Sequence, residues 1–169
     1  MGKKALCHIQ RWSKVVRGEF RDRWKNYLYQ SAMATGVVVL VFLVLQAQNF
    51  VIIASLGSTA FVVFAMPSSL SAKPRRVIGG HLVGLLSGFI ATLIMGSTAL
   101  LPILGYAIAV GLSIYLMVAL DFEHPPASGT ALGIAIGGIS PSVALTVVVS
   151  SIVVSLAHRF LRRFLKDLT

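Results

Sequence analysis

The sequence predicts an all-α integral membrane protein with about six membrane elements. Of its 169 residues, 56% are hydrophobic and only five are Asp or Glu. The apolar residues gather in runs close to membrane length, separated by short polar turns. One stretch, residues 121–126, instead places three ionisable residues and two prolines between apolar runs. Charged, irregular backbone at membrane depth must be solvated by protein or by a water-filled cavity, so this stretch is the first candidate for a substrate or ion pathway.

Three parts are expected along the chain. Residues 1–27 carry apolar side chains at helical spacing between Lys and Arg, which predicts a basic amphipathic helix lying in the membrane interface. Residues 28–160 form the polytopic transmembrane domain, and residues 161–169 form a basic tail. Within the domain, apolar runs cover residues 29–45, 50–66, 77–98, 103–120, 127–139 and 143–160.

The fifth run, residues 127–139, is too short for an ordinary crossing. As a helix it reaches only about 20 Å, whereas a hydrocarbon core is about 30 Å thick. We expect a short, broken helix that begins near mid-depth at Pro125 or Pro126, after an extended segment that dips into the bilayer. The sequence leaves open whether this run crosses fully or re-enters.

The fifteen Lys and Arg residues lie in three places: eight within residues 1–27, three between residues 73 and 76, and four between residues 159 and 166. The positive-inside rule explains this pattern if all three places are cytoplasmic, a condition that six crossings satisfy. We therefore expect an integral protein of a bacterial inner membrane or an equivalent membrane, with both termini cytoplasmic and the lipid bilayer as a partner. Nucleic acid is not an expected partner, because no soluble domain supplies a folded basic surface.

Two similar strings of small residues indicate an internal repeat. Residues 54–60 read Ala-Ser-Leu-Gly-Ser-Thr-Ala, residues 127–131 read Ala-Ser-Gly-Thr-Ala, and a Pro-Ser pair follows each string. Each string belongs to the second element of a three-element half, and three crossings per half give the halves opposite orientations. The sequence thus predicts two inverted halves, an arrangement that places binding sites near the midplane on discontinuous helices.

The same strings predict a site for a small inorganic anion. If both helices start near the midplane, their N-termini oppose each other, and each brings a partial positive charge and unpaired N–H groups. Hydroxyl donors and small residues complete such a site without a formal cation. The candidate anion-binding residues are Ser55, Gly57, Ser58, Thr59, Ser128, Gly129 and Thr130. Plain helix packing is the alternative interpretation, because small residues commonly line membrane helix interfaces.

Two histidines, His81 and His124, are expected at membrane depth. An imidazole there can bind an anion or relay a proton, so both are candidates for gating or proton coupling. The alternative is a histidine that is satisfied by a backbone carbonyl. The remaining charged candidates are Asp121 and Glu123, which pair with the histidines or with arginines or face water, and Arg75 and Arg76, which stand at a cytoplasmic mouth.

Two glycine ladders are expected to pack helices. Glycines recur every four residues at Gly80, Gly84 and Gly88, and again at Gly129, Gly133 and Gly137. Such ladders permit close contact between helices, either within one chain or in a homo-oligomer.

Enzyme activity is not expected. The sequence has no HExxH, no GxSxG, no phosphate-binding loop and no dinucleotide-binding motif, so no cofactor is predicted. A single cysteine and the few assured ligands around His124 do not make a metal site.

The tripeptide His124-Pro125-Pro126, followed by Ala-Ser-Gly-Thr-Ala-Leu-Gly, resembles the motif that names the HPP family of integral membrane proteins. A second block is similar to the family as well: residues 55–60, then Pro67, Ser71, Ala72, Pro74-Arg75 and Gly79-Gly80-His81. The resemblance covers about residues 28–160 and implies a small polytopic membrane protein. Members of this family in plant organelles and cyanobacteria are associated with nitrite transport, so the resemblance implies a small monoanion as the substrate.

Three functions follow as hypotheses. The first is a transporter or channel for a small monovalent anion, with nitrite as the leading candidate. The second is a non-transporting membrane scaffold or regulatory subunit that acts through the basic N-terminal helix. The third is a cation or proton pathway that uses Asp121 and Glu123.

Overall fold

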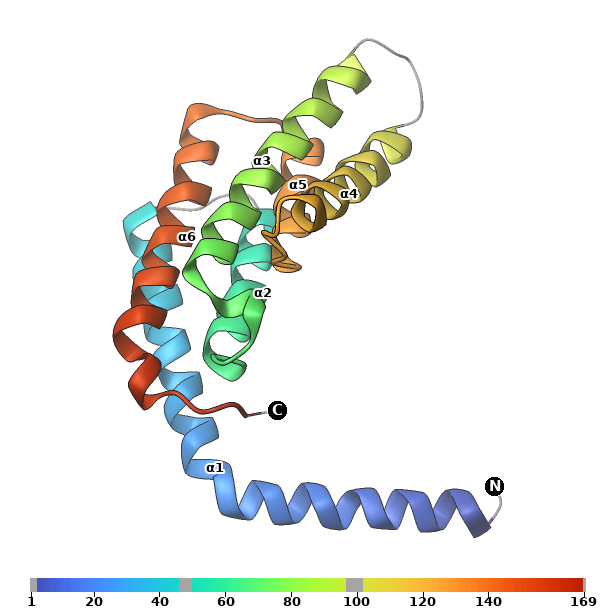
Figure 1. Cartoon of the computed structure of the whole chain (residues 1–169), viewed down its shortest axis with the longest axis vertical. Coiled ribbons are helices and arrows are strands. Elements are labelled where there is room, and N and C mark those ends of the chain that lie inside the picture. The colour runs from blue at the N-terminus through green and yellow to red at the C-terminus, as the bar shows by residue number, and fades with distance from the viewer. Residues whose placement is uncertain (1–2, 46–49, 97–101, 169) are drawn as a thin grey trace.

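The computed structural model describes residues 3–45, 50–96 and 102–168. Within this part of the chain the regular elements are all helical, as the sequence predicts (Figure 1). In chain order they are α1 (Lys3–Leu45), α2 (Phe50–Ala65), η1 (Leu70–Ala72), α3 (Pro74–Gly96), α4 (Pro102–Ala119), α5 (Pro126–Gly137), α6 (Pro141–Leu161) and η2 (Arg162–Phe164). Among the described residues, four helices are long and apolar enough to cross a membrane, namely α1, α3, α4 and α6. The polar turn expected at residues 46–49 lies outside the described residues.

Helix α1 has two legs (Figure 1). The leg that carries the N-terminus runs across one end of the molecule, and the second leg rises and packs against α2 and α6. The boundary expected between an interfacial helix and a first span, at residues 27 and 28, therefore falls inside one continuous helix. On the rising leg Leu28, Leu40 and Leu43 are exposed, as expected for side chains that face lipid.

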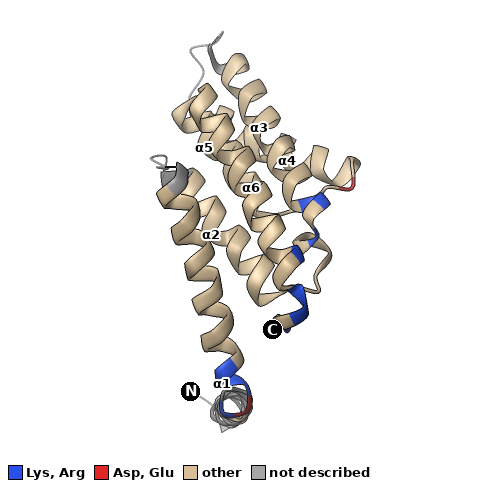
Figure 2. Ribbon diagram, turned by 90° about the vertical axis from the view of Figure 1, so that its left-hand side faces the viewer, with Lys and Arg blue, Asp and Glu red and all other residues tan. Residues whose placement is uncertain are grey.

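Charged side chains gather toward the end of the bundle that holds the C-terminus (Figure 2). This end includes the coloured part of the N-terminal leg of α1, the start of α3 and the segment that follows α6. By contrast, the stretches 77–96, 102–119 and 141–158 contain no Lys, Arg, Asp or Glu. Such a one-sided charge distribution is typical of an integral membrane protein.

Proline marks the start of four helices. Pro74, Pro102, Pro126 and Pro141 are the first residues of α3, α4, α5 and α6. Proline suits this position because its φ is already close to the helical value and its missing N–H would have no intrahelical partner. The start expected for the short helix, at Pro125 or Pro126, is thereby confirmed.

Helix α3 is the packing centre of the bundle and contacts α4, α5 and α6. Its glycines Gly80, Gly84 and Gly88 face the segment that begins at His124 and continues as α5. A Cβ atom at Gly84 would lie 2.5 Å from the Ala127 carbonyl oxygen, closer than real Cβ atoms approach. These glycines therefore bring two backbones together, and this ladder serves packing within one chain.

Helix α5 has 12 residues, which corresponds to about 18 Å, so it does not cross a hydrocarbon core of about 30 Å by itself. Helix α2, with 16 residues, is also shorter than its neighbours α1 and α3. Each half of the chain thus contains a long, a short and a long helix in that order. This order agrees with two three-element halves, whose inverted relation stays a prediction.

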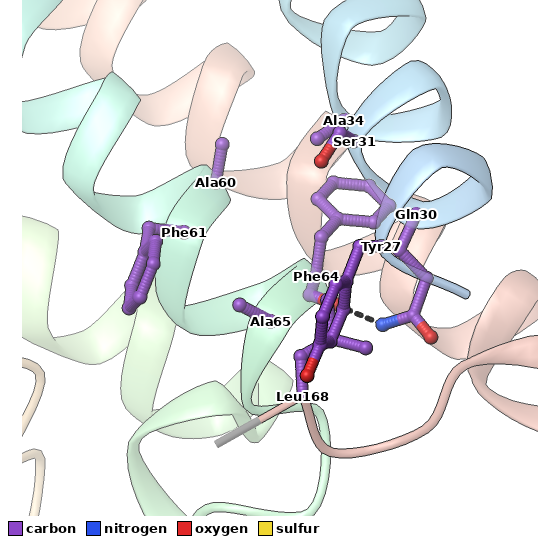
Figure 3. Close-up of a pocket in the computed structure, with 9 residues that line it drawn as sticks. All are labelled: Tyr27, Gln30, Ser31, Ala34, Ala60, Phe61, Phe64, Ala65 and Leu168. Atoms are coloured by element: carbon purple, nitrogen blue, oxygen red, sulfur yellow. Dashed lines mark hydrogen bonds between the residues drawn. The ribbon is translucent and has the colours of Figure 1, made fainter. Parts of the chain in front are cut away.

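Gln30 ties the C-terminal segment to α1 and α2. Its buried side chain donates from Nε2 to the carbonyl oxygens of Phe64 and Lys166, and its Oε1 accepts from the Lys166 N–H at 3.0 Å. Figure 3 shows Gln30 beside a pocket of about 350 Å³ between α1 and α2, with Tyr27 and Leu168 also at its wall. A buried amide with three partners holds these segments in one relative position.

The substitution Gln30→Leu should release the C-terminal segment. The Lys166 carbonyl and N–H would lose their side-chain partner, so limited digestion with trypsin should cut after residue 166 faster than in the unchanged protein. The control is Ser31→Ala, which alters the exposed neighbour of Gln30. Equal cleavage rates in the two variants would show that the segment is held without Gln30.

Candidate functional site

Four buried polar side chains meet where α2, α3 and the start of α5 come together. Thr59, His81, His124 and Thr130 are each at most 1% exposed. The Thr59 Oγ1 atom lies 3.0 Å from Nε2 of His81 and 3.0 Å from Nε2 of His124. On the other side of the His81 ring, Nδ1 lies 2.8 Å from the Thr130 Oγ1 atom. One threonine hydroxyl thus bridges two imidazoles whose ring centres are 5.3 Å apart.

A backbone carbonyl stands at each end of this chain of hydrogen bonds. At one end, Thr130 Oγ1 lies 2.9 Å from Ser55 Oγ, which in turn lies 2.7 Å from the Pro126 carbonyl oxygen. At the other end, His124 Nδ1 lies 2.8 Å from the Ser71 carbonyl oxygen. We call the five linked side chains the His–Thr network: Ser55, Thr130, His81, Thr59 and His124.

Small residues allow these elements to approach one another. Ser55 and Thr59 lie one helical turn apart on α2, so both face α5. A Cβ atom at Gly129 would lie 3.3 Å from the Ser55 Cβ atom, so the absence of a side chain there brings α5 close to α2. On α3, Gly80 permits the same approach, because a Cβ there would lie 2.7 Å from the His124 Cβ atom. The glycines therefore set the spacing on which the network depends.

The carbonyl acceptors determine the hydrogen-bond directions when both histidines are neutral. The Ser71 carbonyl can only accept, so His124 donates from Nδ1, and its Nε2 accepts the hydroxyl proton of Thr59. In this arrangement the single hydroxyl proton of Thr59 is directed to His124 and not to the Ser55 carbonyl oxygen, which lies 3.0 Å from Thr59 Oγ1, so His81 donates from Nε2 to Thr59 and accepts at Nδ1 from Thr130. From Thr130 onward the donors in this arrangement point along one path toward Ser71, whereas Ser55 can donate to Thr130 or to the Pro126 carbonyl oxygen.

A second arrangement holds one more proton. If Ser55 donates to the Pro126 carbonyl, Thr130 donates to Ser55, and His81 then donates from Nδ1 to Thr130. His81 must also carry a proton on Nε2 to reach Thr59, so it becomes an imidazolium. The two arrangements differ by one proton and by the rotation of the Ser55 and Thr130 hydroxyls. In both arrangements the ring nitrogens and hydroxyls stay hydrogen-bonded, so the geometry of the network is compatible with one additional proton.

The four charged candidates form a separate cluster at the start of α3. Arg76 donates to the carboxylates of Asp121 and Glu123, and Arg75 Nη1 lies 3.2 Å from Asp121 Oδ2. Asp121 has a φ of 57°, so the chain turns there and does not run extended as expected. The turn brings both carboxylates to the arginines, and among the described residues neither carboxylate forms a hydrogen bond with a histidine. Among the alternatives that the sequence leaves open, the structure therefore selects the Arg–carboxylate pairing.

The prediction of two opposed helix N-termini is wrong for α2. This helix begins at Phe50, so Ser55 and Thr59 lie inside it, and their N–H groups belong to the helical hydrogen bonds. Hydroxyls do not end the helix because Thr59 Oγ1 can donate to the Ser55 carbonyl, 3.0 Å away. At the start of α5, the N–H groups of Ala127 and Ser128 already donate to carbonyls of the preceding turn. Donors for an anion must therefore come from side chains.

The seven predicted anion-binding residues do not form one site in the structure. The three that join the network are Ser55, Thr59 and Thr130. Gly129 packs against α2, whereas Gly57 and Ser58 are exposed. Ser128 turns toward α4, where its hydroxyl lies 3.1 Å from that of Ser113.

The sequence does not predict two residues that contribute to the site. Ser71 enters the network through its backbone carbonyl, which residue type alone does not reveal. Ser113 is fully buried on α4. A single polar residue within an apolar membrane run is a signal that could have identified Ser113.

Two cavities flank the prolines that precede and begin α5. One cavity, of about 330 Å³, lies between α4 and the start of α5 and is bordered by Glu123, His124 and Ser128. The other, of about 380 Å³, is bordered by Ser58 on α2 and by Pro125. Because the first cavity borders the His124 end of the network, it is the candidate entrance for a small solute.

Comparison with known proteins identifies the family. The family model described as "HPP, transmembrane region" matches residues 19–166. Among similar proteins are two transmembrane proteins of Dictyostelium discoideum: one is 34% identical over 110 residues (63% of this chain and 39% of the relative), and the other is 30% identical over 101 residues (57% and 32%). The matched region thus spans less than half the length of either relative, and no solved structure matches significantly. Because the family model covers most of the chain and the His-Pro-Pro segment contributes directly to the buried network, this protein belongs to the HPP transmembrane family.

Proposed function

We propose that this protein carries a small monovalent anion across the membrane, with nitrite as the first candidate, and that it is not an enzyme. The observation that supports this proposal most strongly is the His–Thr network. Polar and ionisable groups inside an apolar bundle cost free energy, and in membrane proteins they mark solute and proton pathways. The network combines both properties, because it offers hydroxyl donors and can hold one additional proton.

The additional proton supplies the charge that an anion needs. An isolated buried cation is unfavourable, so a monoanion beside the protonated network lowers the free energy of both ions. Uptake of one proton with one monoanion moves no net charge through the apolar bundle. Imidazoles suit this task better than Lys or Arg, because they can lose the proton again and release the anion.

The cavity of about 330 Å³ beside α4 is the proposed route to the network. Ser128 and His124 at its wall offer a hydroxyl and an imidazole to the entering anion. Arg75 and Arg76 are paired with carboxylates, so they would not retain the anion at the mouth. By the positive-inside rule, this mouth and both termini would face the cytoplasm.

Nitrite uptake into proteoliposomes that contain the whole purified chain tests the proposal. We expect uptake above that of protein-free liposomes, which also measure the permeation of nitrous acid. An inward proton gradient should stimulate the protein-dependent part. The variant His124→Ala removes the end of the network and should lower this part about tenfold or more, which corresponds to roughly 1.4 kcal/mol or more.

The matched control for His124→Ala is Ser58→Ala, which changes an exposed hydroxyl of α2 outside the network. We expect this variant to keep the uptake of the unchanged protein. A folded protein without uptake would contradict nitrite transport, and equal uptake by the two variants would contradict a role for the network.

The N-terminal leg of α1 favours a second candidate function, namely a membrane scaffold. This leg extends from the bundle along one end of the molecule (Figure 1), and its sequence is strongly basic. Deletion of residues 1–25 separates the two candidates. A transporter should keep its nitrite uptake, whereas a scaffold should lose the binding of its partner and show no uptake before or after the deletion.

A further inference from the structure

A second polar site lies at the basic end of the bundle, apart from the His–Thr network. A cavity of about 260 Å³ opens between the last turns of α6 and the loop that joins α2 to α3. Its polar wall is formed by three cationic side chains, one imidazole and two serines: Lys73, Arg159, Arg162, His158, Ser68 and Ser69. The cationic residues come from segments almost ninety residues apart, so this cluster exists only in the folded chain.

The charge of this cavity is not neutralised. Arg75 and Arg76 pair with carboxylates, whereas within residues 3–45, 50–96 and 102–168 neither Lys73 nor the two arginines of the cavity form an ion pair. One carboxylate is held close by, because Asp167 Oδ1 accepts a hydrogen bond from the Ser68 N–H at 3.0 Å. Three cations and one carboxylate leave two net positive charges around the cavity.

His158 provides an independent observation. The side chain is 2% exposed, and its Nε2 donates to the Pro67 carbonyl oxygen at 3.1 Å. Its Nδ1 is buried and has no hydrogen-bond partner among the described residues. Buried polar atoms are nearly always hydrogen-bonded, so this residue of the cavity wall keeps one hydrogen-bonding position open, and that nitrogen would donate to an anion when the ring is protonated.

We infer that this cavity binds a phosphate-bearing anion, either the headgroup of an anionic phospholipid or a free phosphate. Arg and Lys are the side chains that bind phosphate oxygens, through charge-assisted hydrogen bonds. Leu156, Phe160 and Phe164 are exposed on the last turns of α6 and on η2, so the elements that carry the arginines of the cavity also carry apolar surface for acyl chains. Basic pockets between membrane helices bind lipid headgroups by this combination of charge and apolar surface.

Native mass spectrometry of the full chain in detergent tests the inference, with phosphatidylglycerol and phosphatidylcholine offered in equal amounts. The unchanged protein should retain phosphatidylglycerol in preference to phosphatidylcholine. The double variant Lys73→Gln/Arg162→Gln should lose this preference. The matched control is Arg163→Gln, which removes the adjacent exposed cation without touching the cavity wall, and it should retain the preference.

A parallel arm replaces the lipid with inorganic phosphate and follows the thermal midpoint of the detergent-solubilised protein. Preference for phosphatidylglycerol that depends on the cavity identifies a lipid headgroup as the ligand. Stabilisation by phosphate that the double variant loses, without a lipid preference, identifies a free phosphate. If the double variant and Arg163→Gln behave alike in both arms, the inference is overturned.

A replacement variant and a transport measurement complete this test. If the double variant aggregates on size exclusion, the single variant Arg159→Gln, at an exposed position of the wall, takes its place. Nitrite uptake should be unaffected by either variant, because the cavity shares no residue with the His–Thr network. The phosphate site and anion transport can therefore fail independently of each other.

Discussion

Thr59→Val should give a folded protein that has lost most of its proton-stimulated nitrite uptake. Valine keeps the size and branching of threonine but removes the oxygen that bridges Nε2 of His81 and Nε2 of His124. Leaving a buried polar group unpaired costs about 1–3 kcal/mol, which corresponds to about 5- to 150-fold in an equilibrium. Uptake into proteoliposomes with and without an inward proton gradient measures the effect.

Two companion variants separate function from stability in this experiment. Thr59→Ser keeps the hydroxyl and should recover most of the uptake. Thr92→Val removes a hydroxyl on α3 that bonds only within its own helix, to the Gly88 carbonyl oxygen at 2.9 Å, and should leave uptake unchanged. If Thr59→Val transports as well as Thr92→Val, the bridging hydroxyl is not part of the pathway.

Gly84→Ala should strongly destabilise the bundle. The added methyl group would lie 2.5 Å from the Ala127 carbonyl oxygen and 3.3 Å from the Thr130 Cβ atom, so α5 must move away from α3. Overpacking of this kind costs about 1–3 kcal/mol, and a backbone atom cannot rotate aside as a side chain can. We expect the thermal midpoint in detergent to fall on the order of 5 °C or more.

Gly111→Ala is the matched control for this substitution. A Cβ atom at Gly111 on α4 meets nothing within 4 Å, and alanine favours a helix more than glycine does, so this variant should be neutral or slightly more stable. The two variants differ only in whether the new methyl group has space. Equal midpoints for both would show that α5 does not lie against α3 as described.

Helix limits follow from the sequence where the signal is local. The starts of α5 and α6 are marked by Pro126 and Pro141, because proline acts on the backbone at its own position. The start of α2 at Phe50 agrees with the apolar run predicted from residue 50, whereas the interpretation of the small-residue string at Ser55 as a helix N-terminus is wrong, because hydroxyls and glycine resemble a helix boundary in water. Inside an apolar bundle the Thr59 hydroxyl lies within hydrogen-bonding distance of the Ser55 carbonyl oxygen of its own helix and of two imidazoles, so it needs no water and the small-residue string continues α2.

Residue types at the site are also visible in the sequence, but their partners are not. His81, His124, Thr59 and Thr130 stand out because polar side chains are rare in apolar runs. Which of them touch depends on how closely the helices approach. The sequence therefore groups Ser128 with Thr130, whereas the structure turns Ser128 toward Ser113 on α4.

By itself, the sequence determined that this chain is a helical membrane protein, that its charge lies at one end, and that the His-Pro-Pro segment precedes a short helix. These properties depend on hydrophobicity and backbone chemistry that act within a few residues. Only the tertiary structure decided that Thr59 joins His81 and His124, which lie 22 and 65 residues away along the chain. The physical reason is that such contacts exist only where the glycines of α3 and α5 let separate helices come within hydrogen-bonding distance.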